Sequence, residues 1–430
     1  MPPSRIPRRE FVKTAVAIGG TAALSACLGR EDPDLPRGDP SGYPRRQHAW
    51  NGALPTDDHG NDVPPRHHVV RLLDYRGEVP TDADRETVEA ALRSLERAYP
   101  RSHETDGGRR VGLLSTVAYS PSYFERFDAP LDGVDLPAPE PLAPFEDPTP
   151  DDPDAAVHLA SDYGSVVLAA EEALLGERET VNGVEVDADL SGVFAGADLA
   201  GDGRTRRTGF IGAGLPADHQ DVEGVPDSEP VPEESPLYMG FESGFEGSQA
   251  TEDRVTVDSG PFAGGTTQHL SQIRLNLQQW YEQDSREHRE SVMFCPVHAE
   301  EGRIEGTGEN LGAANRVADC ADDVAADAAE SGKVGHAQKV ARAREDGRPR
   351  ILRRDFDSTD DGRATVHFLS LQSDIGEFVA TREAMNGTDV ADSAAVGQRS
   401  NNGILQYISV ERRGNYLVPP RDRRALPAPD

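Results

Sequence analysis

The chain has 430 residues, a formal net charge of −32 and a hydrophobic content of 36%, which is enough for two globular domains of ordinary size. So many carboxylates repel phosphates, which excludes a nucleic acid or an anionic membrane surface as a partner. Lys13, Lys333 and Lys339 are the only lysines, and an acidic surface poor in Lys is what a protein of a halophile needs to stay hydrated in concentrated salt.

Residues 1–27 have the features of an export signal. Arg8 and Arg9 form a twin-arginine (Tat) pattern, and a short apolar run follows them. The sequence Leu-Ser-Ala-Cys then ends at Cys27 and is typical of a lipobox. We therefore expect a secreted lipoprotein, extracellular or held on the outer face of the cell membrane by a lipid on Cys27. Residues 28–65 are rich in Pro, Gly and Asp and are predicted to be a disordered tether.

Residues 66–203 are predicted to form the first folded unit. Apolar alternation predicts a strand from Arg66, and helical spacing predicts a helix over 82–98. Strands over 111–119 and 155–160 and a helix over 166–175 follow. This order is that of a ferredoxin-like α+β unit.

Residues 204–430 repeat the α+β pattern and are predicted to be a second ferredoxin-like unit with its own antiparallel sheet. The expected elements are a strand that runs into a helix over 268–290, a strand over 364–371 and a helix over 376–384. A final hairpin is expected from strands over 403–410 and 415–418. No clear sequence repeat links the two units.

The stretch GFIGAGLP, residues 209–216, is predicted to be a tight loop whose backbone, at Gly212, can approach a ligand. Asp218, His219 and Asp221 follow this loop. They fit either a metal or acid–base site or a solvated acidic cluster.

Cys295 and Cys320 are the only cysteines after Cys27. Outside the cytoplasm they could form a disulfide, and closing a loop of about 25 residues stabilises a fold by roughly 3 kcal/mol. Free buried thiols are the alternative. Cys295-Pro296 beside His298 also fits a haem or metal motif.

The stretch HAQKVARAREDGRPRILRRDF begins at His336 and includes Arg353 and Arg354. A Gly-Arg-Pro turn divides it, so we expect an arm that leads out, turns and returns as a strand. Such a hairpin can place an imidazole and a guanidinium on opposite sides of a flat ligand such as haem, where an Arg stabilises developing negative charge. The alternative is a surface His beside a basic loop.

Four stretches in this order resemble the dye-decolourising (DyP-type) haem peroxidases, from Arg66 to Pro420. They are LLSTVAYSPSYFERF, PLAPFEDPTPDDPDAAVHLASD, HAQKV with RPRILRRDF, and ILQYISVERRGNYLVPP. The resemblance implies two ferredoxin-like units of the dimeric α+β barrel superfamily. It also implies haem b in the second unit and oxidation of an organic donor by hydrogen peroxide.

Carried over by this resemblance, His336 is the proximal iron ligand and Arg354 the distal catalytic Arg over the haem. Arg353 faces elsewhere or meets a haem propionate. The family has an acidic residue that receives the N–H of the proximal His, and this chain has Asn401 and Asn402 at that place.

The loop GFIGAGLP resembles the family's GxxDG loop but has Gly212 or Ala213 where the distal Asp is expected. Asp218, His219 or Asp355 could move the proton instead.

Three functions remain open from the sequence. The first is a peroxidase whose partners are hydrogen peroxide and an unidentified reducing substrate. The second is an exported haem-binding protein without turnover, and the third is a surface binding protein without haem. The sequence also leaves open whether copies of the chain form a homo-oligomer.

Overall fold

A closed antiparallel sheet forms the centre of the molecule. The computed structural model describes residues 35–58, 60–101, 105–106, 109–110, 112–228, 230–243, 247–304, 306–307, 320–391 and 395–430. In spatial order the sheet runs through β10 (Arg206–Phe210), β13 (Phe356–Ser358), β14 (Thr365–Gln372), β11 (Thr266–Leu275), β15 (Ile408–Val418), β4 (Leu114–Tyr119), β6 (Ala155–Ser161) and β1 (His67–Tyr75). β1 also pairs with β10, which closes the ring.

The remaining strands are short. β5 (Thr149–Pro150), β9 (Phe194–Gly196) and β12 (Leu352–Arg353) join the large sheet. β2 (Thr105–Asp106) pairs with β3 (Arg109–Arg110), and β7 (Thr180–Val181) pairs with β8 (Val184–Glu185).

The expected α+β class and antiparallel pairing are confirmed, but the second half does not have a sheet of its own. Its strands meet those of the first half at Leu417↔Tyr119, between β15 and β4. They meet again along β10 and β1, where Phe210 lies opposite His67. Closure leaves few strand edges with unpaired backbone groups, and such edges invite wrong pairing with other chains.

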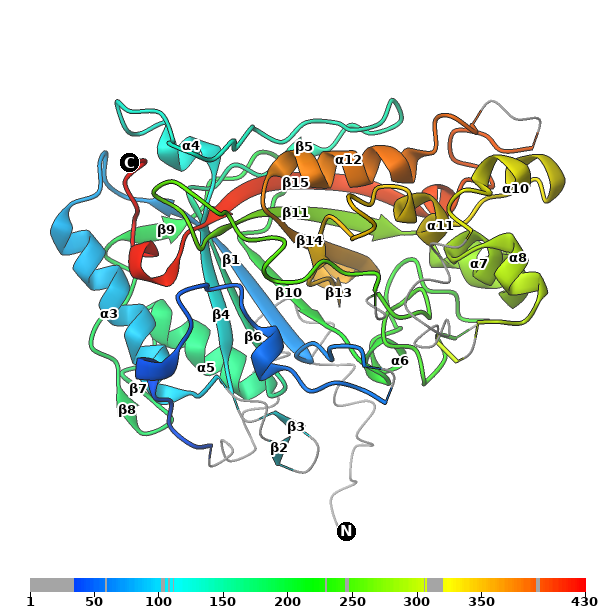
Figure 1. Cartoon of the computed structure of the whole chain (residues 1–430). Helices are drawn as coiled ribbons and strands as arrows, with labels where there is room; N and C mark the ends of the chain where they lie inside the picture. Colours follow the sequence, from blue (N-terminus) through cyan, green and yellow to red (C-terminus); the bar gives the residue numbers. More distant parts are fainter. Residues whose placement is uncertain are drawn as a thin grey trace, which may run out of the picture.

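The helices lie outside the sheet in two groups. α3 (Asp82–Ala98) and α5 (Gly164–Leu174) cover the part formed by β1 and β6 (Figure 1). α12 (Ile375–Asn386) lies along β11 and β14, and α11 (His336–Ala341) packs against α12. α7 (Arg286–Met293), α8 (Pro296–Glu300) and α10 (Val324–Glu330) gather at the same end (Figure 1).

The other helical segments are single turns. They are η1 (Pro40–Gly42), η2 (Asn51–Ala53), α4 (Pro121–Phe124), α6 (Leu215–Asp218), η3 (Gln279–Gln283), η4 (Asp360–Gly362), η5 (Leu405–Tyr407) and η6 (Arg421–Arg423). None of the helices in the described part of the chain is both long and apolar enough to cross a membrane.

Local sequence accounts for the long helices. At α3, the Thr81 hydroxyl accepts the N–H of Asp84 while the Asp84 carboxylate accepts the N–H of Thr81, a capping box. α12 begins at a side-chain cap from Asp374 and ends at Gly387, whose φ of 56° suits glycine. The helix expected over 82–98 is therefore confirmed at both ends.

The prediction of a disordered tether is wrong from Leu35 onwards. Leu35 and Trp50 are buried. The Gln47 amide donates to the carbonyls of Val117 and Pro419 and accepts the N–H of Val117. This segment thus lies against β4 and the end of β15, where its polar groups find backbone partners.

The prediction of a C-terminal hairpin is also wrong. β15 is one strand of 11 residues that runs straight through Arg412, Arg413 and Gly414. It pairs with β11 along its length, with a register shift at Gln272/Ile273. The two Arg side chains are buried in ion pairs, so the sequence that reads as a polar turn lies inside the fold.

Asp151 joins the two halves of the sheet. Its carboxylate accepts hydrogen bonds from Arg207 on β10 at 2.5 Å and from Arg412 on β15 at 2.7 Å. All three side chains are at most 7% exposed. Such a pair stabilises a fold only while each buried charge keeps its partner.

Candidate functional site

An apolar cavity lies between the helices α11 and α12 and the strands β11, β14 and β15. Its volume is about 220 Å³, far more than the roughly 10–15 Å³ that one water needs. Ile273, Leu275, Val366, Phe368, Phe378 and Met385 form much of its wall. A largely apolar cavity with a few converging polar groups is typical of a cofactor or ligand site.

His336 is the first residue of α11 and lines this cavity. Its Nδ1 is buried and has no hydrogen-bond partner in the described part of the chain. Burial, and then the charge of Lys339, lowers the pKa of His336 to about 3, so the imidazole is neutral near pH 7 and able to bind a metal.

Arg353, and not Arg354, lines the cavity. Arg354 points to the other side of the strand, where it donates to Asn51 Oδ1 at 2.5 Å and lies over the Trp50 ring. Arg354 therefore does not line this cavity, whereas the sequence led us to expect it over the ligand. The side chains of an extended segment point alternately to opposite faces, so residues two apart share a face. Leu352 and Phe356 belong to the buried core on the side of Arg354.

Asp355 shares the cavity face with Arg353. The Ser243 hydroxyl donates to its Oδ2 at 2.6 Å, whereas Oδ1 is buried and has no partner among the described residues. Burial raises the pKa of Asp355, and the nearby Arg353 partly opposes this rise. Asp357 also lines the cavity, but its Oδ2 is occupied by the N–H of Tyr238. Asp355 therefore has a carboxyl oxygen that is available to exchange a proton with a molecule in the cavity.

Four further Arg side chains line the cavity, and none of them was predicted as a site residue from the sequence. Arg350 pairs with Glu377, and Arg382 and Arg413 both pair with Glu146. Arg344 is different, because it donates to the carbonyls of Gly347 and Gly247 and its buried Nε has no partner in the described residues. An anion in the cavity would find its least compensated cation at Arg344.

The GFIGAGLP loop lies outside the cavity wall. Gly212 has a φ of 119°, donates its N–H to Pro236 and lies beside Arg66. His219 stacks on Phe210 with ring centroids 4.4 Å apart, and its Nδ1 meets the Leu215 carbonyl. The expected ligand contact of Gly212 is thus not seen, and neither His219 nor Asp218 reaches the cavity.

Asn401 and Asn402 do not bind His336. Asn402 accepts a hydrogen bond from the buried Lys339 ammonium at 2.5 Å and donates to Asn386, while Asn401 donates to Ala395. Within the described part of the chain, no carboxylate accepts a hydrogen bond from His336 Nδ1, whereas such a bond makes many metal-binding histidines more basic. The predicted lipidation site, Cys27, lies outside the described residues.

Comparison with known families identifies the chain. A family model described as a family of unknown function, DUF7405, matches residues 65–420. The chain belongs to the DUF7405 family. No curated protein is significantly similar in sequence to this DUF7405 protein.

Solved structures show which fold this DUF7405 chain shares. The encapsulated DyP-type peroxidase from Mycobacterium smegmatis is 13% identical, with a TM-score of 0.54 over 87% of this chain and 99% of that one. A DyP-type peroxidase protein from Shewanella oneidensis is 13% identical, with a TM-score of 0.53 over 84% and 94%. A variant of DypB from Rhodococcus jostii in complex with heme is 16% identical, with a TM-score of 0.51 over 84% and 94%. The chain therefore has the DyP-type peroxidase fold.

Proposed function

We propose that the chain is a haem-dependent peroxidase that oxidises an organic donor with hydrogen peroxide. The observation that carries the proposal is that one apolar cavity is lined by a neutral His, an Arg and a carboxyl with a free oxygen, namely His336, Arg353 and Asp355. The shared fold and the heme complex of the Rhodococcus jostii relative support this choice.

The cavity residues suit haem. His336 Nε2 would bind the iron, and the apolar walls would contact the ring and exclude water. Haem carries two carboxylates, and the hydrogen bonds that Arg344 and Arg353 make to described residues all go to neutral groups. We expect haem b, because none of the described residues that line the cavity is a Cys that could form a covalent link.

Two side chains would act on the peroxide. Bound haem would supply an iron that exchanges electrons with hydrogen peroxide. Arg353 keeps its positive charge and would stabilise negative charge that develops as the O–O bond breaks. Asp355 Oδ1 would accept a proton from one peroxide oxygen and return it to the oxygen that leaves as water. Asp355 would thus transfer the proton that a distal Asp would transfer, since the GFIGAGLP loop contains no Asp.

Haem binding without turnover is the second candidate. It is favoured by the lack of a partner at His336 Nδ1, because a carboxylate at that nitrogen would make the iron ligand more basic. Export by the twin-arginine route, a lipid on Cys27 and life in high salt remain proposals, supported by the signal pattern and the net charge of −32.

Turnover distinguishes the two candidates. The haem-loaded chain and the variant His336→Ala are given hydrogen peroxide and an anthraquinone dye in high salt. A peroxidase bleaches the dye over many turnovers, and His336→Ala does not. Haem that stays bound while the dye stays coloured would leave the binding protein as the function.

A further inference from the structure

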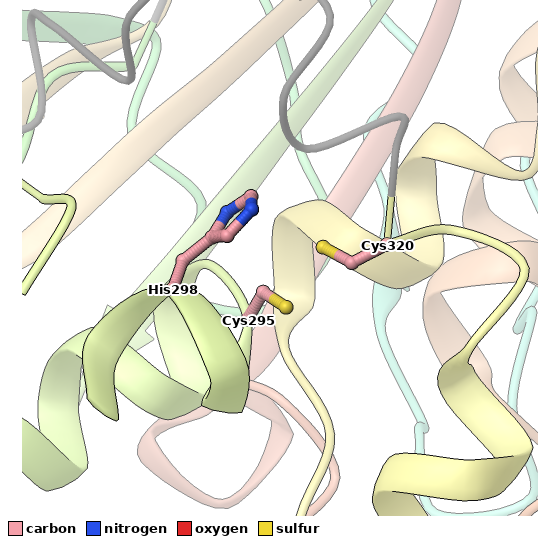
Figure 2. Close-up of side chains that lie close together, drawn as sticks. All are labelled: Cys295, His298 and Cys320. Atoms are coloured by element: carbon pink, nitrogen blue, oxygen red, sulfur yellow. The ribbon is translucent and has the colours of Figure 1, made fainter. Parts of the chain in front are cut away.

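A second site lies behind the His336 helix, outside the cavity. Cys295, His298 and Cys320 each have one potential ligand atom, and these atoms all lie within 4.8 Å of one another. Figure 2 shows the three side chains close together. We propose that these three residues bind a thiophilic divalent cation, with zinc as the first candidate. This site stands on its own residues and does not depend on haem.

The ligand chemistry favours zinc. Zinc is bound in proteins by Cys sulfur and His nitrogen in tetrahedral sites, and three protein ligands leave the fourth position for water. The three side chains are at most 5% exposed. Two thiolates and a neutral imidazole around a divalent cation give a site with no net charge, which lowers the cost of its burial. The Cys320 thiol donates to Cys295, which lowers the pKa of Cys295 and raises that of Cys320.

The local structure brings the ligands together from separate segments. Cys295 precedes α8, His298 lies within α8, and Cys320 lies ahead of α10. Cys295 and Cys320 are not joined by a disulfide. A disulfide would use only the two sulfurs, whereas a metal would use one ligand atom from each of the three residues.

The site is linked to the helix that carries His336. Gln338 on α11 donates its backbone N–H to the Phe294 carbonyl at 3.1 Å and its side-chain amide to the Cys320 carbonyl at 2.8 Å. A Cβ on Gly335 would lie 1.8 Å from the Phe294 oxygen, so the two backbones are in direct contact. A bound metal would therefore stabilise the segments around Phe294 and Cys320, against which the His336 helix packs.

The test is the metal content of the full chain. Protein purified with a reductant, incubated with zinc chloride and desalted should retain about one zinc per chain. The double variant Cys295→Ser/Cys320→Ser should retain almost none, and His298→Ala should bind zinc at least about tenfold more weakly. Cys27→Ser and His288→Ala are the matched controls and should retain zinc as the original chain does.

A second measurement does not require a variant. Cobalt in place of zinc should give a near-ultraviolet thiolate-to-cobalt absorption, and a chelator should remove it reversibly while circular dichroism follows the fold. Absence of zinc from the reduced, folded chain would overturn the proposal. Zinc retained by the double Ser variant, or a Cys295–Cys320 disulfide in protein prepared with zinc present, would do the same.

Discussion

At the scale of single residues, the cavity depends on which of two adjacent Arg side chains faces it. The sequence could have decided this, because Leu352 and Phe356 are apolar and alternate with Arg353 and Asp355. Core-facing Leu and Phe place Arg354 on the core side. The resemblance to a family selects Arg354, whereas Arg353 is the Arg of this pair that lines the cavity. His336 could be selected from its spacing, whereas Arg344 could not, because its partners come from separate loops.

Replacement of Arg353 should affect the reaction rate, and replacement of Arg354 should affect the stability of the fold. Arg353→Leu should lower the rate of peroxide-dependent oxidation by about 10²–10³-fold, because a positioned donor is lost from the cavity. Arg354→Leu should leave that rate nearly unchanged and lower the free energy of unfolding by about 1–3 kcal/mol, because Asn51 and Glu252 lose a buried partner. Steady-state kinetics and urea unfolding measure the two effects. The reverse pattern would restore Arg354 to the site.

The ionisation of Asp355 should determine how the rate of peroxide-dependent oxidation falls at acid pH. Burial raises the pKa of its carboxyl above the usual value, and only the carboxylate can accept a proton. The rate should therefore rise as the pH rises through this raised pKa. Asp355→Asn should lower the rate by about 10²–10⁴-fold and remove that fall at acid pH. An unchanged fall at acid pH in Asp355→Asn would assign the proton transfer to another group.

At the scale of elements, helices were easier to predict than strand pairing. The apolar spacing and the local capping box predict α3, so its 17 residues and their N-cap are enough to predict the helix. β15 was divided in the prediction because Arg412, Arg413 and Gly414 have the composition of a turn. Their buried partners, Asp151 and Glu146, lie more than 260 residues earlier in the chain.

Asp151 should be critical for stability because its carboxylate links Arg207 on β10 to Arg412 on β15. Asp151→Ala leaves Arg207 and Arg412 buried without their carboxylate and should lower the free energy of unfolding by about 3–5 kcal/mol. The exposed neighbour Asp152 is the control. Asp152→Ala should change the free energy of unfolding by less than about 0.5 kcal/mol. Chemical denaturation of both variants makes the comparison. Equal effects would contradict a specific role for the buried carboxylate.

At the scale of the whole molecule, neither the closure of the sheet nor the order of residues 35–65 could be predicted. Both depend on contacts between distant segments, such as Gln47 with Val117 and Pro419. Composition suggests a tether because this segment is polar, yet polar groups such as the Gln47 amide find hydrogen-bond partners in the rest of the fold. The net charge of −32 is the property of the whole chain that the sequence does determine.

Stability should rise with salt. The Debye length falls from about 10 Å at 0.1 M to about 3 Å at 1 M, so repulsion among the carboxylates is largely screened by then. The unfolding midpoint should climb steeply up to about 1 M KCl and more slowly above it, where only exclusion of salt from the surface acts. A thermal melt across this range gives the result. A midpoint that does not change below 1 M would argue against adaptation to salt.

The most direct test of the whole account is a haemin titration followed by absorption. His336 is the only His among the described residues that line the cavity. The partly exposed His288 on α7, which pairs with Asp284, is the matched control. The original chain and His288→Ala should develop a Soret band that saturates at about one haemin per chain, whereas His336→Ala should lose or shift it. An identical band in all three, or no band in the original chain, would contradict haem ligation by His336.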